Sequence, residues 1–412
     1  MARRDIRSLD RSLFVFCMAV LSLTVAYPAA RLLMVAVFGW AHEAIAHNPG
    51  RAAIINTAVM SFATVVTSGI VGSALAFLLT RYTFPGRRIL AGLAYMPFTL
   101  PPLVGVLSFY YLVGLDGLLP RFCEQRLGIG GLALRGPWAI LLVHTYSFYV
   151  YFYAMIGAAL ETVDVSQLEA ARTLGAGRCR VFFRVMMPML KPALLGAALL
   201  TFMSSGASFS APYIFGNRYP MLSVEIFHER TQFNDARAAT LTAVLAALSL
   251  LGVLVFRSRR RAAGGASKGV RVPLRSRAGR AAATVTAALC MAVILMPHLA
   301  ILWLSLVDHR AWHTELVPTA FTWANYREIF TSAQDFAPIR NSLWMSALAA
   351  GACLLVALPA GYLIGRGRPG AAWVNLLVMI PWALPGTVTA MNLILAFNHP
   401  RFSLVGTVWL LP

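Results

Sequence analysis

Charged side chains are rare in this sequence, and one short stretch between two long apolar runs, residues 167–192, holds an unusual number of them. It contains a single glutamate, Glu169, and five cationic residues: Arg172, Arg178, Arg180, Arg184 and Lys191. A cationic side chain at the centre of a bilayer costs roughly 2.5–3.5 kcal/mol. The stretch must therefore leave the hydrocarbon, and the chemistry open to it there is recognition by charge and shape.

The residue types in and around this stretch predict two helices joined by a sharp turn. Residues 161–174 contain no glycine or proline, and Gly175 provides the left-handed conformation that commonly ends a helix. A second helix is predicted over residues 178–187, with one stripe of apolar side chains and another of arginines. Pro188 and Pro192 are expected to stop or kink this helix before the next apolar run begins.

The order Glu169-Ala170-Ala171, three residues, Gly175 and finally Pro188 resembles the EAA loop of binding-protein-dependent ABC importer permeases. In that family the loop docks into a groove on the cytoplasmic ATPase, and the resemblance implies the same role for these residues. Two alanines let a helix approach a groove closely, and Gly175 lets the second helix fold back. The alternative is an amphipathic helix pair held on lipid headgroups by its arginines. The spacing favours docking, so we call residues 161–192 the coupling segment.

The composition indicates a membrane protein. Hydrophobic residues make up 59% of the chain, charged residues make up 12%, and the mean hydropathy is +0.70. The apolar share lies far above that of a soluble domain. The net charge of +20 does not indicate a nucleic-acid partner, because the basic residues lie in short loops between apolar runs.

Apolar runs that approach or exceed about 20 residues predict transmembrane helices along the whole chain. These runs are residues 13–30, 52–80, 89–112, 137–160, 193–210, 238–256, 281–307, 341–366 and 371–397. If the basic loops face inward, the N-terminus and the coupling segment are cytoplasmic, and residues 114–136 and 211–237 lie outside. The predicted fold class is an all-α, polytopic transmembrane helical bundle in a bacterial inner (plasma) membrane.

The second half of the chain repeats the first. The pair Pro97 and Pro101 returns in register as Pro381 and Pro385, and both copies begin inside, so the repeat is parallel. The expected segments are an anchor helix with a periplasmic loop (1–51), a first core (52–256), a basic linker (257–280), a second anchor with its loop (281–340) and an incomplete second core (341–412). We expect the linker to be a flexible cytoplasmic connector rather than a nucleic-acid or lipid site.

This layout resembles that of fused permeases, in which both transmembrane subunits of a type I importer, with MetI-like cores, lie on one chain. The resemblance is closest to the ferric-iron, polyamine and 2-aminoethylphosphonate branch, and ferric iron is the substrate that we expect. It implies a cytoplasmic ABC ATPase dimer and a periplasmic or lipid-anchored substrate-binding protein, with a second permease chain as a further candidate. A second EAA loop is missing before residue 412, so we expect a C-terminally truncated permease, or a remnant that inserts without transporting.

Several kinds of chemistry are not expected. No GxxxxGK[ST] phosphate-binding loop occurs, so ATP should be bound by a separate subunit, and this chain should be neither an enzyme nor a cofactor protein. The five cysteines form no CxxC pair, and no metal site is expected. The spans hold almost no ionisable side chain except His144, which disfavours a secondary transporter. His144 fits a packing role better than a proton relay.

Candidates for the translocation path are the repeated prolines and a group of small hydroxyl residues. They are Pro97, Pro101, Ser204, Ser205, Ser208, Pro381 and Pro385. Small hydroxyl residues also serve close helix packing in membranes, which is the simpler explanation for the three serines.

Overall fold

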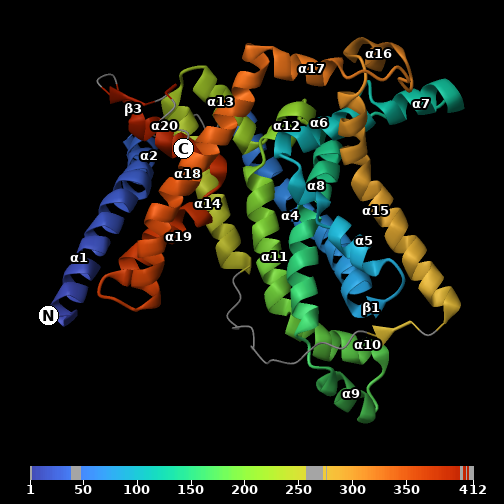
Figure 1. The fold of residues 1–412 in the computed structure, drawn as a ribbon, viewed down its shortest axis with the longest axis horizontal. Coiled ribbons are helices and arrows are strands. Elements are labelled where there is room, and N and C mark those ends of the chain that lie inside the picture. The colour runs from blue at the N-terminus through green and yellow to red at the C-terminus, as the bar shows by residue number, and fades with distance from the viewer. Residues whose placement is uncertain are drawn as a thin grey trace. The chain divides into compact units, whose positions relative to one another are not determined.

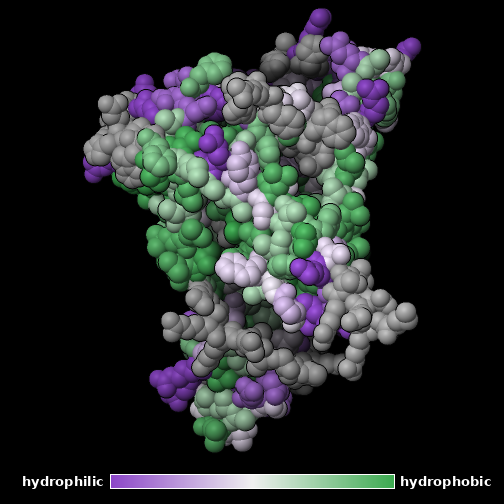
Figure 2. Space-filling view, turned by 90° about the vertical axis from the view of Figure 1, so that its left-hand side faces the viewer, coloured by the Kyte–Doolittle hydropathy of each residue, from purple (hydrophilic) through white to green (hydrophobic). Residues whose placement is uncertain are grey.

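The structure, a computed structural model, describes residues 2–38, 48–256, 272–274, 276–399, 402–404 and 406–407. In this part of the chain the fold is helical apart from four strands of two residues each (Figure 1). Within the described residues, eight helices are long and apolar enough to cross a membrane, and one bent helix pair would make a ninth. On the face shown in Figure 2, hydrophobic residues cover the middle of the helices and hydrophilic residues gather at their ends. The predicted all-α, polytopic fold class is confirmed.

The chain forms two compact units. The first-core unit holds Ala52–Met221 and Leu251–Phe321, and the second-core unit holds Met1–Arg51, Leu222–Leu250 and Thr322–Pro412. α14 (Asp235–Phe256) contributes residues to both units.

Three long helices organise the first-core unit. They are α4 (Asn48–Ala76), which continues into the π-helical turn η2 (Phe77–Arg81), α8 (Gly136–Glu161) and α11 (Met187–Ala207). α8 packs closely against α11, and Tyr149, Ile156 and Leu190 are fully buried in the core that these helices share. The remaining helices of the unit are α5 (Arg87–Leu93), α6 (Pro102–Val113), α7 (Leu118–Leu127), α9 (Val165–Thr173), α10 (Arg178–Val181), α12 (Ser210–Phe215), α15 (Arg277–Ser305) and α16 (His309–Thr314).

The predicted second anchor helix, α15, packs against the first core. It contacts α5, α6 and the 3-10 turn η3 (Met96–Thr99). Its buried residues Ala287, Met291 and Ile294 belong to the same core cluster as Tyr149. Residues on opposite sides of the basic linker therefore share one core.

The predicted span over residues 89–112 is not one proline-kinked helix, and this prediction was wrong. The structure divides it into α5, η3 and α6, with Leu100 extended (φ −87°, ψ 124°) immediately before Pro101. The ring of a proline clashes with an α-helical residue before it and drives that residue to the extended region. The proline pair therefore breaks the helix instead of bending it.

The second-core unit packs the N-terminal helix against the second repeat. Its N-terminal part comprises α1 (Ala2–Leu21), the π-helical turn η1 (Ser22–Ala26) and α2 (Tyr27–Phe38). Its other helices are α13 (Leu222–Thr231), α17 (Ala324–Thr331), α18 (Ala333–Gly365), α19 (Ala371–Ala383) and α20 (Gly386–Phe397). An ion pair joins Asp10 to Arg368 (Oδ2 to Nε, 3.0 Å), and Tyr27 Oη donates to the carbonyl of Ala396 (3.3 Å).

The two copies of the repeat have similar backbone conformations at the glycine before the helix and at the second proline. Gly86 and Gly370 are both left-handed, with φ of 77° and 83°, and each precedes the helix of its copy. Pro101 and Pro385 have nearly the same conformation (φ −55°, ψ 141° and φ −57°, ψ 149°). In each copy a helix of 12 residues follows the second proline. The two copies differ before that point, because α19 is continuous where the first copy is broken.

Two pairs of short strands occur among the described residues, and the first pair joins the linker to the first core. β1 (Tyr82–Thr83) pairs in parallel with β2 (Val272–Pro273), and β3 (Asn398–His399) pairs antiparallel with β4 (Phe402–Ser403). Residues 257–271 and 275 of the linker predicted to be flexible lie outside the described residues. α15 begins at Arg277, before the predicted start of the second anchor.

Candidate coupling site

The first helix of the coupling segment is shorter than predicted. α8 continues to Glu161, the chain turns at Thr162, and α9 begins at Val165 rather than being part of one helix over 161–174. Asp164 caps α9, because its side-chain oxygen Oδ1 accepts a hydrogen bond from the backbone N–H of Ser166 (2.9 Å). Aspartate is among the best N-cap residues, since its oxygen satisfies a donor that the helix cannot. This cap starts a new helix directly after the membrane span.

Gly175 ends α9 in the predicted left-handed conformation, with φ of 82°. The N–H of Gly175 donates to the carbonyl of Arg172 (2.9 Å), and the N–H of Ala176 donates to that of Ala171 (3.0 Å). These two bonds form a Schellman motif, which satisfies carbonyls left free at a helix end. The predicted turn is confirmed, and it leads from α9 into α10.

One face of the segment is buried against the first core, and the opposite face is open. Leu168 and Val181 are buried in the same core cluster as Tyr149. Glu169 and Ala170 are exposed, and Leu174 is 87% exposed at the end of α9. The carboxylate of Glu169 forms no ion pair with any residue that the structure describes.

Positive charge surrounds the exposed face. The side chains of Arg172, Arg178, Arg180, Arg184 and Lys191 are all exposed. The surface therefore presents the Glu169 carboxylate and Ala170 within a basic region, while Ala171 is half-buried against the first core. In Figure 1 α9 and α10 lie beyond the ends of α8 and α11, so this surface is displaced from the apolar part of the helices.

The second predicted helix of the segment was expected to stop or kink at Pro188, and it does not stop there. α10 leads through a π-helical turn, η4 (Phe182–Met186), into α11, and residues Arg178–Ala207 form one continuous helical span. Pro188 lies in the first turn of α11 and Pro192 lies inside it. Proline cannot donate to the carbonyl four residues earlier, and a local π turn is one of the adjustments by which a membrane helix satisfies the freed carbonyl. Movement of the coupling segment is thus tied directly to a membrane helix.

The predicted path residue Ser205 lies in a buried polar cluster inside the first core. Its Oγ is 3.0 Å from Nδ1 of His144 and 3.2 Å from Oγ1 of Thr64. All three side chains are almost fully buried. Ser204 donates to Tyr151 Oη (3.3 Å), whereas Ser208 ends α11. The contacts agree with a packing role for His144 and Ser205.

The sequence reading missed the polar stripe on α4 that completes this cluster. The stripe consists of Thr57, Ser61, Thr64 and Ser68, and each of these side chains is fully buried. Their spacing of four, three and four residues places them on one helix face. The regular spacing of hydroxyl residues in this apolar helix could have predicted which face of α4 packs against its neighbours.

Three of the four path prolines lie where a helix is interrupted or begins, and the fourth, Pro381, lies inside α19. Pro97 is buried in η3 and Pro101 is exposed at the start of α6, whereas Pro381 is exposed inside α19 and Pro385 is buried before α20. At the first break, the carbonyl of Met96 accepts from Thr99 Oγ1 (2.7 Å) and lies 3.1 Å from His298 Nε2. A histidine of α15 therefore contributes to satisfying the interrupted backbone.

Comparisons with known proteins agree with this arrangement. The family described as "Binding-protein-dependent transport system inner membrane component" matches residues 68–263, which include the whole coupling segment. "Probable ABC transporter permease protein y4fN" of Sinorhizobium fredii is 29% identical over 93% of this chain and 70% of its own length. The sulfate transport system permease protein CysT of Salmonella typhimurium is 30% identical over 59% of this chain and 88% of its own length.

One further relative bears on the substrate, and one solved structure is similar in part. The ferric transport system permease protein FbpB of Actinobacillus pleuropneumoniae is 26% identical over 86% of this chain, which covers 52% of its length. A structure of the MetNI methionine ABC transporter in inward-facing conformations matches 51% of this chain and 95% of its own chain, with 17% identity and a TM-score of 0.38. The relatives are transport proteins, which confirms that an enzyme is the wrong class for this chain.

Proposed function

Since the chain belongs to the binding-protein-dependent transport system inner membrane component family, we propose that its coupling segment transmits ATP-driven motion from a separate ATPase dimer to the translocation path. The chain is a multi-pass permease subunit of an ABC importer. Nucleotide is bound and hydrolysed by the ATPase, and this chain carries no cofactor of its own.

The geometry of the coupling segment carries the docking proposal. Leu168 and Val181 anchor the segment on the first core, while Glu169, Ala170 and Leu174 face water. A short helix with small residues on its open face can enter a groove closely. The continuity of α10, η4 and α11 supports transmission, because a displaced α10 moves the membrane helix that carries Ser205.

Ferric iron is the proposed substrate. The ferric permease FbpB matches 86% of this chain, whereas the sulfate permease CysT matches 59% of this chain. A match that extends over both halves of the chain supports the ferric assignment more than a match to one half. Sulfate is the second candidate, because the identity to CysT is higher over the matched residues.

The remaining parts of the proposal concern the substrate-binding protein, the orientation of the chain and the translocation path, and they follow from its being an importer permease. A substrate-binding protein delivers the substrate on the side of the membrane opposite α9 and α10, and the N-terminus lies on the cytoplasmic side. The serines at 204, 205 and 208 and the prolines at 97, 101, 381 and 385 stay candidate path residues, with a second permease chain as a candidate partner.

The proposal is tested by uptake in the organism that carries the gene. A deletion strain is complemented with the wild-type chain, and the uptake of radiolabelled ferric iron, sulfate and molybdate is measured separately. The proposal predicts that only ferric iron uptake falls in the deletion strain and returns on complementation. Loss of sulfate uptake alone would transfer the assignment to sulfate, and unchanged uptake of all three would refute both substrates.

A further inference from the structure

Two tyrosines on α8 reach the interrupted backbone between α5 and α6. Tyr149 Oη donates to the carbonyl of Ala94 (2.8 Å). Tyr153 Oη donates to the carbonyl of Ala91 (2.9 Å). The two tyrosines are four residues apart, so they lie on the same face of the helix. Both side chains are almost fully buried, which places these hydrogen bonds inside the first core.

The carbonyls that the tyrosines reach are those that lose a backbone donor where α5 ends. In an α-helix, the N–H four residues later would donate to each carbonyl. Here the N–H of Tyr95 donates to Gly92 (3.1 Å) rather than to Ala91. The N–H of Phe98 donates to Tyr95 (3.1 Å) rather than to Ala94. An unsatisfied backbone group inside a membrane costs several kcal/mol, so the two hydroxyls supply the bonds that let the chain leave the helix.

The second copy of the repeat shows the same segment in another conformation. α19 is continuous over Ala371–Ala383, which correspond to residues 87–99 of the first copy. It carries Pro381 at the position of Pro97, so a proline at this position does not by itself break the helix. α19 packs against α1 and α18, whereas η3 packs against α8. One repeat unit therefore adopts two forms, and the broken form is the one to which tyrosines donate.

α8 connects these tyrosines to the coupling segment. Tyr153 lies eight residues before Glu161, the last residue of α8, which is about 12 Å along the helix. α9 begins four residues later, at Val165. Rigid secondary elements carry coupling between distant sites. A displacement of α8 at Glu161 therefore moves the hydroxyls that hold the interrupted backbone.

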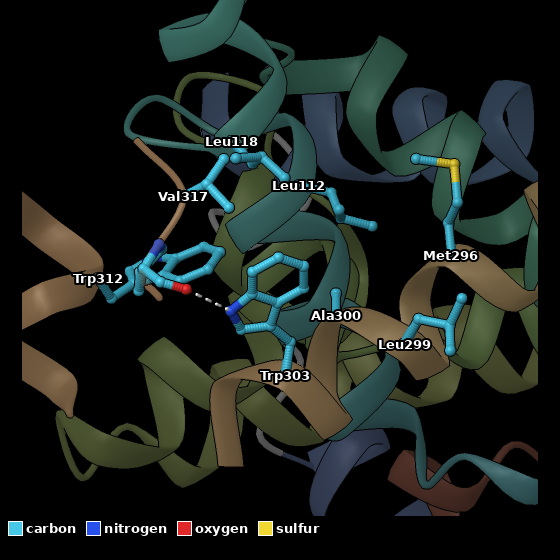
Figure 3. Close-up of a pocket in the computed structure, with 9 residues that line it drawn as sticks. Leu112, Leu118, Met296, Leu299, Ala300, Trp303, Trp312 and Val317 are labelled. Atoms are coloured by element: carbon cyan, nitrogen blue, oxygen red, sulfur yellow. Dashed lines mark hydrogen bonds between the residues drawn. The ribbon is translucent and has the colours of Figure 1, made fainter. Parts of the chain in front are cut away.

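The other side of the interrupted segment is held by α15. Nε2 of His298 lies 3.1 Å from the carbonyl of Met96. α15 also packs against α6, and both helices line an apolar pocket of about 230 Å³ whose walls include Leu112 and Met296 (Figure 3). Protein interiors are close-packed, so a space of this size leaves α6 room to shift against α15.

We propose that Tyr149 and Tyr153 are positioning residues of the transport cycle, which hold the segment between α5 and α6 in its broken form and release it when α8 moves. The inference rests on the proposed function, in which the ATPase displaces α8 through the coupling segment. On release, the two carbonyls take back their backbone N–H donors, and residues 87–99 become one helix, as the corresponding residues are in α19. The path prolines beside the break change position with each cycle.

Spin-label distances test the backbone change in the purified full chain, with its native cysteines replaced by alanine. One pair of labels is attached at Ile89→Cys and Phe98→Cys, and a reference pair in register on α19 is attached at Trp373→Cys and Trp382→Cys. All four side chains are exposed. Nine residues of continuous helix span about 13.5 Å, a separation that continuous-wave electron paramagnetic resonance measures. With both tyrosines present, the first pair should differ in distance from the reference pair.

Removal of the two hydroxyls should shift the first pair toward the reference distance. In the Tyr149→Phe/Tyr153→Phe variant, the balance between the two forms should change about sevenfold, the factor for two hydrogen bonds between membrane helices. Tyr151→Phe is the matched control, because this α8 hydroxyl accepts from Ser204 instead (3.3 Å), and it should leave the distance unaltered. The reference pair and thermal unfolding in detergent show whether each variant is folded.

Transport is measured in parallel, in vesicles that hold the chain with its ATPase and binding protein. The double variant should continue to hydrolyse ATP, while the ferric iron imported per ATP falls by a similar factor. A first-pair distance that the double substitution leaves unaltered would overturn the inference whether or not the chain transports. So would a shifted distance with an unchanged ratio of iron to ATP. Absence of uptake by the wild-type chain would refute the proposed function and, with it, the transport role of the tyrosines.

Discussion

At the scale of single residues, Gly175 is the position where backbone geometry and proposed function coincide. Its φ of 82° is in the left-handed region, and no atom lies within 4 Å of the place where a side chain would begin. Gly175→Val should therefore cost about 1–2 kcal/mol through the backbone alone, since L-residues are disfavoured there. We expect loss of ATPase co-purification and of uptake, with membrane insertion unchanged.

Gly177→Val is the matched control for this substitution. Gly177 also lies in open space, but its φ of −65° and ψ of 162° suit any residue. The control should retain the ATPase, measured as the ratio of the two proteins after affinity purification. Stoichiometric ATPase recovered with Gly175→Val would show that the left-handed turn is not needed for docking.

Substitution of Ser205 distinguishes a role in helix packing from a role in the translocation path. If its bonds to His144 and Thr64 serve helix packing, Ser205→Ala should lower stability by about 0.6 kcal/mol, the average for a hydrogen bond between membrane helices. Substrate preference in the uptake assay should not change. Ser204→Ala, which loses a longer contact to Tyr151, should have a smaller effect on the melting temperature. A changed substrate preference in Ser205→Ala would assign this serine to the path.

At the scale of elements, the contact between α4 and α8 depends on Gly72. A Cβ at this position would overlap the carbonyl oxygen of Tyr149 and lie 2.7 Å from Cβ of Phe152. Gly72→Ala should destabilise the first core by about 1–3 kcal/mol, because two packed helices would have to separate. Thermal unfolding in detergent measures the effect.

Gly351→Ala in α18 is the control for Gly72→Ala, because no atom lies within 4 Å of its Cβ position. It should be neutral or slightly stabilising, since alanine is the better helix former. If both substitutions lower the melting temperature equally, close packing at Gly72 is not the cause.

At the scale of the whole molecule, the orientation of the chain in the membrane is the property to be measured. Cys179 is an exposed cysteine of α10, and Asp116 is exposed between α6 and α7, at the other end of the first core. In single-cysteine variants, a membrane-impermeant maleimide should label Asp116→Cys in intact cells. It should label Cys179 only after the membrane is permeabilised. Labelling of both sites in intact cells would contradict the proposed topology.

Much of this protein was determined by local sequence. Hydrophobic runs located the spans of α4, α8, α11 and α15, because the bilayer requires about 20 apolar residues whatever their neighbours are. Gly175 specified its own left-handed turn, since no other residue type adopts that conformation so readily. The repeat was visible because Gly86 and Pro101 return as Gly370 and Pro385 with the same backbone angles.

Other features were decided only by tertiary structure. The sequence predicted that Pro188 stops or kinks a helix, but the helix does not stop there and continues through a π turn. The sequence also predicted one membrane helix over Pro97 and Pro101, but the chain breaks there and His298 from α15 contacts the interrupted backbone. Both outcomes depend on which groups neighbouring helices offer to a backbone that has lost a donor. The same holds for the His144 cluster, whose parts come from helices far apart in the chain. Local propensity determines where a helix is interrupted, and tertiary packing determines which group replaces the missing hydrogen bond.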